Sequence, residues 1–236
     1  MMKNKKSLPT NHTLIGTKIE KSIKNYKWEY ILSDLPKNSF LVGGYIRDLI
    51  IGKNIKRNDI DIDIIVPQNA YLVGKNISEK YKGKFIILDK SREIVRIIIE
   101  GLTIDIAPQI SKDLIEDITS RDFTINSISF SFDAKILFDP LNGIDDINKS
   151  LLKTYQAKNL IEDPLRILRC FRFVSELNFD IDEKLFALIN LYKDELASVS
   201  VERIQYELKR IIRGENAFRT VLLIKQNNLF NWLQPH

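Results

Sequence analysis

One short segment of the chain, DIDIDIIV at residues 59–66, alternates aspartate with isoleucine and then becomes wholly apolar. Alternate side chains of a β-strand point to opposite faces of a sheet, so three aspartates would line one face while isoleucines fill the other. Aspartate is a poor strand residue, and neighbouring like charges repel one another. The segment therefore predicts a strand with a charged face, which either binds a metal cation or is simply a polar outer surface.

The residue types that are available for catalysis limit the reactions that such a strand could support. The 236 residues include one cysteine, Cys170, and two histidines, His12 and His236, which lie near the chain ends. An internal disulfide is excluded, and a Ser-His-Asp triad or a zinc site of histidine and cysteine is disfavoured. Carboxylates, arginine, lysine and hydroxyls remain, and they suit Mg²⁺ and phosphate substrates. A single cysteine also favours a reducing, cytoplasmic location.

Charge and hydrophobicity add weaker constraints. The net charge of +5 fits a nucleic-acid partner, although many basic proteins bind none. Hydrophobic residues make up 44% of the chain, which is enough to build a core. No apolar run approaches the roughly 18 residues that a membrane span needs, and the basic start lacks the apolar stretch of a signal peptide. We therefore expect no membrane partner.

The hydrophobic period changes along the chain. Helical periods and short strand-like runs are mixed up to about residue 150, whereas helical spacing dominates beyond about residue 155. This pattern predicts an α+β fold with a small mixed or antiparallel sheet, followed by helices. The expected parts are a flexible N-terminal arm at 1–12, a catalytic head at 13–150, a helical neck at 151–213 and the start of a helical body at 214–236.

A glycine turn precedes the aspartate strand, in LVGGYIRD at residues 41–48. Two glycines after a strand let the backbone approach a ligand closely, and the amides that open the next helix can hold phosphate. Such a turn is often purely structural. Together with the aspartate strand it suggests a nucleoside triphosphate, with phosphates near Gly43, Gly44 and Arg47 and a metal ion at the aspartates.

Two later segments carry arginine beside aspartate. SRDFTINS at 120–127 is typical of a helix start with a salt bridge. In EDPLRILRCFRF at 162–173, Asp163 and Arg166 are three residues apart and would share a helix face, with Arg172 on the same basic side. This pair is either an intrahelical ion pair on a solvated face or an acceptor and a donor aimed at the edge of a base.

These segments, in this order, resemble the class II tRNA nucleotidyltransferases and their poly(A) polymerase relatives. The resemblance runs from about Phe40 to about Trp232, and it also takes in DPLNGIDDI at 139–147 and VERIQYELKRI at 201–211. It implies a polymerase-β-like nucleotidyltransferase head and a helical neck that recognises the base. The implied enzyme adds nucleotides to the tRNA 3′ end without a nucleic-acid template, from CTP and, as the open alternative, ATP. The oligomeric state does not follow from it.

The resemblance also assigns roles to residues. Asp61 and Asp63 match the catalytic carboxylates that hold two Mg²⁺ ions; Asp59 is the alternative in an overlapping register, and Asp105 is a candidate third carboxylate. Asp163 and Arg166 match the pair that selects C and A by hydrogen bonds resembling Watson–Crick pairing. The full set of implied nucleotide-binding residues is Gly43, Gly44, Arg47, Arg121, Asp122, Asn126, Asp163, Arg166 and Arg169.

The chain departs from the family pattern in ways that bear on specificity. Ser120 stands where a second arginine is usual. IVRIIIEGLTIDIAPQ leaves almost no room for the flexible loop of full CCA-adding enzymes, which favours a CC-adding enzyme. GKNISEKY at 74–81 lacks the Gly-basic-basic-Phe signature of bacterial poly(A) polymerases. The chain also stops at His236, soon after the neck, so it is either truncated or a minimal form. A poly(A) polymerase and a non-catalytic RNA-binding relative remain the alternatives.

Overall fold

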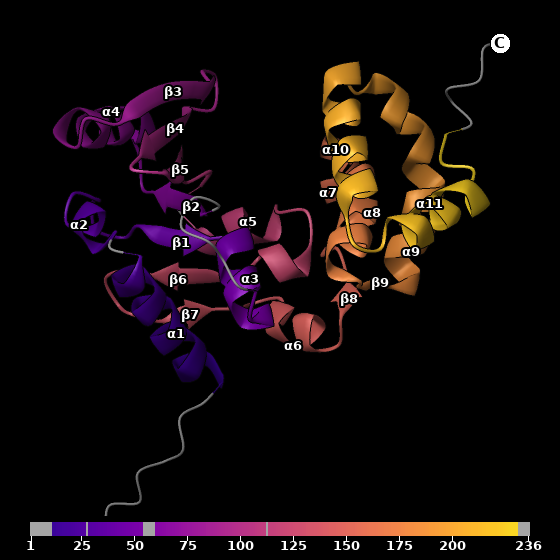
Figure 1. Cartoon of the computed structure of the whole chain (residues 1–236), viewed down its shortest axis with the longest axis horizontal. Coiled ribbons are helices and arrows are strands. Elements are labelled where there is room, and N and C mark those ends of the chain that lie inside the picture. Colours follow the sequence, from indigo (N-terminus) through magenta and orange to yellow (C-terminus); the bar gives the residue numbers. More distant parts are fainter. Residues whose placement is uncertain (1–10, 27, 54–59, 112, 231–236) are drawn as a thin grey trace, which may run out of the picture. The chain divides into compact units, whose positions relative to one another are not determined.

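The computed structural model describes residues 11–26, 28–53, 60–111 and 113–230 (Figure 1). Asp59, the alternative metal ligand, lies outside them, as do residues 1–10 of the predicted N-terminal arm. The chain forms two compact units, one of Met1–Ile118 with Ile128–Pro140 and one of Thr119–Ser127 with Leu141–His236. Among the described residues, no helix combines the length and the apolar character that crossing a membrane requires.

The first unit is built on a mixed sheet, which has seven strands among the described residues, in the order β3-β4-β5-β2-β1-β6-β7. β2 and β5 are parallel, and the other neighbours are antiparallel. The strands are β1 (Phe40–Val42), β2 (Asp61–Val66), β3 (Lys84–Asp89), β4 (Ile94–Ile99), β5 (Leu102–Pro108), β6 (Ser129–Ser131) and β7 (Leu137–Phe138).

The apolar alternation of the sequence explains these strands. Ile62 and Ile64 of β2 are buried, as are Val95 and Ile97 of β4 and the alternate residues of β5. β4 and β5 are joined by Glu100-Gly101, both with positive φ (48° and 85°), as a tight two-residue hairpin turn requires. The end of β2 is buried on successive residues because this strand is central and pairs in parallel with β5.

Helices cover this sheet. α4 (Ala70–Lys80) packs on β3, β4 and β5, and α3 (Gly44–Ile51) packs on β1 and β2 and also against α1 (Asn11–Asn25). The unit also contains the short helix α2 (Glu29–Leu32) and most of the short helix α5 (Leu114–Thr119), because its first segment ends at Ile118. Trp28 is fully buried, and its ring meets Tyr45 and Phe132 edge-on.

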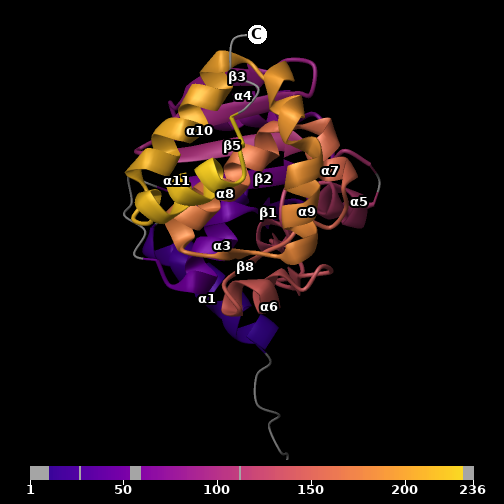
Figure 2. The same ribbon diagram turned by 90° about the vertical axis from the view of Figure 1, so that its right-hand side faces the viewer.

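The second unit is helical and centres on α8 (Leu165–Leu177), which packs against α7, α10 and α11 (Figure 2). The short strands β8 and β9 of this unit pair in parallel as a two-stranded sheet. The elements are η2 (Thr124–Asn126), α6 (Gly143–Asn148), β8 (Leu151–Leu152), α7 (Lys158–Glu162), β9 (Asp180–Ile181), α9 (Glu183–Tyr192), η3 (Lys193–Ser198), α10 (Val201–Arg213) and α11 (Ala217–Gln226).

The predicted fold class is confirmed: a mixed sheet with helices is followed by a helical segment, although the two short strands β8 and β9 stand in the segment that was expected to be all-helical. Helical spacing in the sequence predicts two buried stripes, one of Ile161, Leu165, Leu168, Phe171 and Val174 and one of Val201, Ile204, Leu208 and Ile211, and both need correction. Ile161, expected in the stripe of α8, belongs to the separate helix α7 and is half exposed (50%). Val201 is exposed on α10, where Glu207 is buried between Ile204 and Ile211 instead. Glu207 can occupy this core position because Arg172 of α8 lies beside it.

Candidate active site

The two aspartates of β2 lie on one face of the strand. Asp61 is exposed and Asp63 is half-buried, whereas Ile60, Ile62 and Ile64 are buried on the opposite face. The charged face predicted from the alternation is therefore present. In the sheet register, Asp63 lies beside Asp105 of the parallel strand β5. Neighbouring strands are about 4.8 Å apart, so a further carboxylate stands in the same row.

An arginine that the sequence analysis did not single out completes this row. Arg96 of β4 is the register partner of Asp105. Its Nε and Nη2 donate to the two oxygens of Asp105 at 2.7 and 2.8 Å. These hydrogen bonds, together with the charges of Asp105, Asp61 and Asp63, raise the pKa of Arg96 against the opposing effect of burial. The alternation in IVRIII places Arg96 on the polar face of its strand, but only the register identifies its partner.

The carboxylates of β2 have the ligand chemistry that a hard metal ion requires. Mg²⁺ prefers oxygen ligands and usually keeps several waters, with one or two protein carboxylates and substrate phosphates completing its shell. Asp61 and Asp63 supply such a pair. Within the described ranges, no group of three or more Asp, Glu, His or Cys side chains is arranged to hold a metal. The residues thus fit a two-aspartate site, and the role of Asp105 as a third ligand stays a prediction.

The glycine turn begins next to Asp63. Val42, the last residue of β1, pairs with Asp63, and Gly43 follows with φ 79° and ψ −143°, angles that side chains disfavour. Gly44 opens α3, and a Cβ there would lie 3.3 Å from Nη2 of Arg47. Arg47 is buried, and its Nε donates to Asp48 at 2.8 Å. Gly43 therefore follows the register partner of Asp63, and Gly44 and Arg47 come directly after it in α3.

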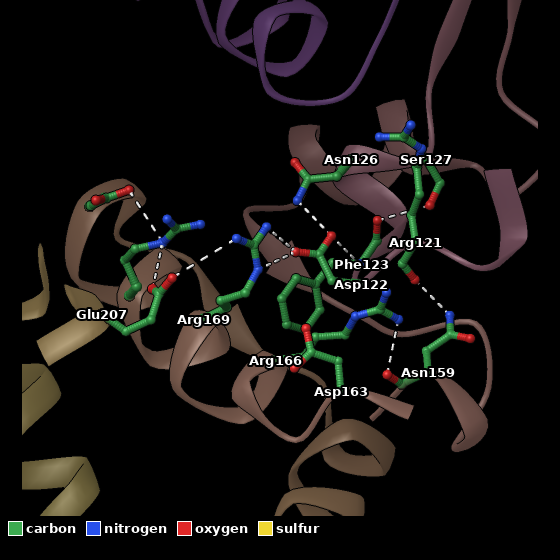
Figure 3. A network of polar contacts seen from close by, with 12 residues as sticks. Arg121, Asp122, Phe123, Asn126, Ser127, Asn159, Asp163, Arg166, Arg169 and Glu207 are labelled. Atoms are coloured by element: carbon green, nitrogen blue, oxygen red, sulfur yellow. Dashed lines mark hydrogen bonds and ion pairs between the residues drawn. The ribbon is translucent and has the colours of Figure 1, made fainter. Parts of the chain in front are cut away.

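The second unit contains the other predicted residues, centred on Asp122 (Figure 3). One carboxylate oxygen of Asp122 accepts from Asn126 Nδ2 at 2.9 Å and from the amide of Phe123 at 2.8 Å. The other accepts from Nε and Nη2 of Arg169 at 2.9 and 2.6 Å. Burial would raise the pKa of Asp122, but the charge of Arg169 and the hydrogen bonds hold it well below its usual range. Asp122 is therefore an ionised hub.

The segment around η2 is fixed by side chains that the sequence analysis did not predict. Asn159 Nδ2 donates to the carbonyl oxygens of Thr119 (2.9 Å) and Arg121 (2.6 Å). Thr124 Oγ1 donates to one carboxylate oxygen of buried Asp146 at 2.7 Å. The other oxygen of Asp146 accepts from Lys153. Asp146 lies in the family-like segment 139–147, and here it holds Thr124 in place. Arg121 itself is half-buried.

The predicted base-selecting pair lies where α7 meets α8. Asp163 follows α7 with an extended backbone (φ −143°, ψ 90°). Arg166 lies in the first turn of α8, and its Nη1 donates to the carbonyl oxygens of Ser120 and Asn159, both at 2.9 Å. The Asp163 carboxylate instead accepts from Nη2 of Arg203 on α10, at 3.1 and 3.0 Å. Among the described residues, no side-chain hydrogen bond or ion pair joins Asp163 to Arg166 (Figure 3).

The basic side of α8 continues inward as a line of alternating charges. Arg172 is buried, so it does not lie on the solvated face that was one of the two alternatives, and its Nε lies 3.3 Å from an oxygen of Glu207. Glu207 also lies 4.0 Å from Arg169, which links this line to Asp122. Burial lowers the pKa of Arg172 to about 10. The arginines of α8 therefore join the Asp122 hub to α10.

Comparison with known proteins places these features in a family. Residues 39–153 match the poly A polymerase head domain, and residues 178–236 match a domain described as the probable RNA and SrmB- binding site of polymerase A. A CC-adding tRNA nucleotidyltransferase from Synechocystis sp. is 33% identical over 84% of this chain and 47% of that protein. A CCA-adding enzyme from Staphylococcus aureus is 30% identical over 86% of this chain and 54% of that protein.

Solved structures agree in fold. The Thermotoga maritima CCA-adding enzyme complexed with tRNA superposes with a TM-score of 0.73 at 29% identity, covering 83% of this chain and 48% of that one. A CCA-adding enzyme in complex with CTP gives the same TM-score and identity, covering 84% and 48%. This chain spans about half the length of the curated relatives that it matches. From the family matches and these relatives, the chain belongs to the tRNA nucleotidyltransferase and poly(A) polymerase family.

Proposed function

We propose that this chain is the catalytic part of a template-independent nucleotidyltransferase that adds C to the 3′ end of tRNA, using CTP and releasing pyrophosphate. The observation that carries the proposal is the pair Asp61 and Asp63 on one face of β2, with the glycine turn that starts after Val42, the register partner of Asp63. Relatives named CC-adding and CCA-adding enzymes support the substrate class.

The residues of the head would position the reacting groups. Two Mg²⁺ ions on Asp61 and Asp63 would supply activation of the 3′-hydroxyl and neutralisation of charge on the leaving pyrophosphate. The amides that open α3 and the Arg47 guanidinium would hold the triphosphate oxygens. Arg96 adds a fixed positive charge to the carboxylate row, which reduces repulsion between the aspartates and the phosphates. A histidine base is not needed in this arrangement.

Side chains would replace a template in choosing the base. A carboxylate only accepts hydrogen bonds, and a guanidinium only donates them. Cytosine and adenine offer an exocyclic amino group, whereas guanine and a uracil-type base present a carbonyl oxygen at the equivalent edge. Asp163 would therefore accept from the amino group of C or A and repel the carbonyl oxygen of U or G. Arg166, held by two carbonyl oxygens, would donate to the ring acceptor.

The preference for C over a terminal A is supported by one short connection. β5 ends at Pro108 and α5 begins at Leu114, so five residues, 109–113, join them. This leaves no space for the flexible loop that the family resemblance links to A addition. Three of the similar curated proteins are named CC-adding enzymes. We therefore propose CC addition, with CCA addition as the alternative.

A chain-length assay tests the proposal. The 236-residue chain is incubated at high concentration with Mg²⁺ and tRNA transcripts that end at the discriminator base, after the first C or after the second C, with CTP, ATP or both. We expect two C additions, no extension of the third transcript and loss of activity in Asp61→Asn/Asp63→Asn. Asp145→Asn removes an exposed carboxylate paired with Lys149 and is the matched control.

Each other outcome of the assay selects an alternative. Efficient addition of A to the third transcript would show a CCA-adding enzyme. Long A tails on unstructured RNA would show a poly(A) polymerase. CTP binding without incorporation on any transcript would favour the non-catalytic RNA-binding relative. Full activity in the double variant would overturn the assignment of Asp61 and Asp63.

A further inference from the structure

The Asp163 carboxylate is held by a residue outside the segments to which roles were assigned. Arg203 lies in the first turn of α10, forty residues along the chain, and its Nη2 reaches both oxygens of Asp163. The Arg203 side chain is 53% exposed and that of Asp163 is 30% exposed. An ion pair this exposed contributes little to folding stability. Its main effect is therefore on the position of the Asp163 carboxylate.

Two other guanidinium groups compete for the same carboxylate. Burial lowers the pKa of Arg166, and the charges of Asp122 and Asp163 act against that effect, so Asp163 is within electrostatic reach. The charge of Asp163 also acts on Arg169. Arg169 already pairs with Asp122 and lies 4.0 Å from Glu207. Arg166 uses only Nη1 for its two carbonyl partners, so its Nε and Nη2 lie outside those contacts.

We propose that Arg203 is a positioning residue for base selection, which keeps the Asp163 carboxylate apart from Arg166 so that the two present a separate acceptor and donor. This inference rests on the proposed function and adds a residue to it. Without Arg203, the carboxylate turns toward the remaining donors of Arg166, because Nε and Nη2 take no part in the two carbonyl contacts and the charge of Asp163 already acts on this arginine. The acceptor and donor then satisfy each other, and a nucleotide must separate them before it can bind.

The structure explains why Arg203 suits this role. Pro164 fixes the backbone directly after Asp163, and Arg166 is anchored by two carbonyl oxygens, so only the Asp163 side chain is left to turn. Arg203 approaches from α10, whereas Arg166 belongs to α8. Binding through a single nitrogen, Nη2, also leaves the carboxylate with lone pairs for a base amino group.

The test compares CTP with UTP in the wild-type chain and in Arg203→Met. We expect the ratio of kcat/KM for CTP to that for UTP to fall roughly two- to fivefold, which is the scale of one exposed ion pair. The change should appear in the KM for CTP, with kcat and the KM for tRNA little altered. Arg203→Lys keeps the charge and should restore most of the ratio. A ratio unchanged in Arg203→Met would overturn the proposal.

A matched control separates this effect from the loss of a surface charge. Arg219 of α11 is similarly exposed and also pairs with an aspartate, Asp180. Arg219→Met should leave the CTP to UTP ratio at its wild-type value. Circular dichroism and melting temperature check that both variants fold. An equal fall in the ratio in both variants would show a general charge effect and overturn the proposal.

A double-variant cycle tests whether Arg203 acts through Asp163. In an Asp163→Asn background, Arg203→Met should cause no further loss of discrimination; the same fold-loss there would contradict the proposal. Equilibrium binding of CTP and UTP gives a readout apart from catalysis. If the wild type binds CTP selectively but transfers nothing, the proposed function fails while the role of Arg203 is still measured by binding. If it binds no nucleotide, both fail together.

Discussion

At the scale of single residues, burial separates the aspartates of this protein into two kinds. Asp61 is exposed and Asp63 is half-buried on the polar face of β2. Asp122 and Asp146 are buried, and hydrogen bonds from arginine, asparagine, threonine or lysine meet their oxygens. The first kind can bind a cation from solution. The second kind holds parts of the helical unit together, and the lowered pKa of Asp122 links the ionisation of that residue to folding.

Asp122 should make folding stability depend on pH. Its folded pKa lies below the unfolded value of about 4, so its ionised form stabilises the folded state above that value, and this contribution is lost as the pH falls. We expect the free energy of unfolding to decrease from about pH 5 downward, and to do so less steeply in Asp122→Asn. At pH 7 this variant should lose on the order of 3 kcal/mol because Arg169 is left partly buried without its partner.

Denaturant titrations between pH 7 and pH 3 measure this effect. Asp145→Asn, an exposed carboxylate of α6, should keep the wild-type slope. Equal slopes in the wild type and in Asp122→Asn would contradict the linkage.

Asp105 and Asp63 stand side by side but should differ in function. Both oxygens of Asp105 are bound by Arg96, so we expect Asp105→Asn to lower activity while leaving the Mg²⁺ concentration for half-maximal activity within about twofold of the wild type. Asp63→Asn should lose on the order of a thousandfold, the scale of several kcal/mol of transition-state stabilisation by a metal ion. Magnesium titrations of both variants measure this. A large rise in the Mg²⁺ requirement of Asp105→Asn would make Asp105 a third ligand.

At the scale of elements, sequence periodicity identifies a strand or helix but not its charged partner. β2 could be predicted because its isoleucines and aspartates alternate strictly and its apolar end is continuous. α10 could be located, but its buried stripe was predicted with Val201, where the structure has Glu207 instead. A buried glutamate contradicts the hydrophobic pattern unless a cation faces it. Arg172, which faces it, comes from α8, and no local pattern reveals that contact.

The contact between α8 and α10 should therefore depend on an intact charge pair. Glu207→Gln leaves Arg172 buried with its main counter-charge removed, and we expect a loss of about 3 to 5 kcal/mol in unfolding free energy. A double variant with apolar residues, Glu207→Leu/Arg172→Met, should recover part of that loss because neither charge is then buried alone. Urea denaturation measures both. Glu202→Gln, an exposed change on the same helix, should have almost no effect; no difference between Glu202→Gln and Glu207→Gln would contradict the expectation.

At the scale of the whole molecule, the order of the motifs could be predicted from the sequence, whereas the path of the chain could not. The chain passes between its two units after Ile118, after Ser127 and after Pro140, so the short segment that carries Asp122 folds with the helices of the second unit. Asn159 and Asp146 hold it there. Their partners lie twenty to forty residues away, beyond the reach of helical or strand periods. Arg203 was not predicted for the same reason.

Nucleotide binding should be visible as stabilisation of the whole chain. A ligand that binds only the folded state adds about 2.7 kcal/mol at one hundred times its Kd, which corresponds to several degrees in melting temperature for a chain of this size. We expect CTP with Mg²⁺ to raise the melting temperature more than UTP with Mg²⁺ does. Chelation of Mg²⁺ should remove most of the increase, because the triphosphate would lose its link to Asp61 and Asp63. Asp61→Asn/Asp63→Asn should respond to CTP as weakly as the chelated wild type, whereas Asp163→Asn should still be stabilised but should no longer distinguish CTP from UTP. Equal shifts with CTP and UTP in the wild type would mean that the chain recognises the triphosphate without reading the base.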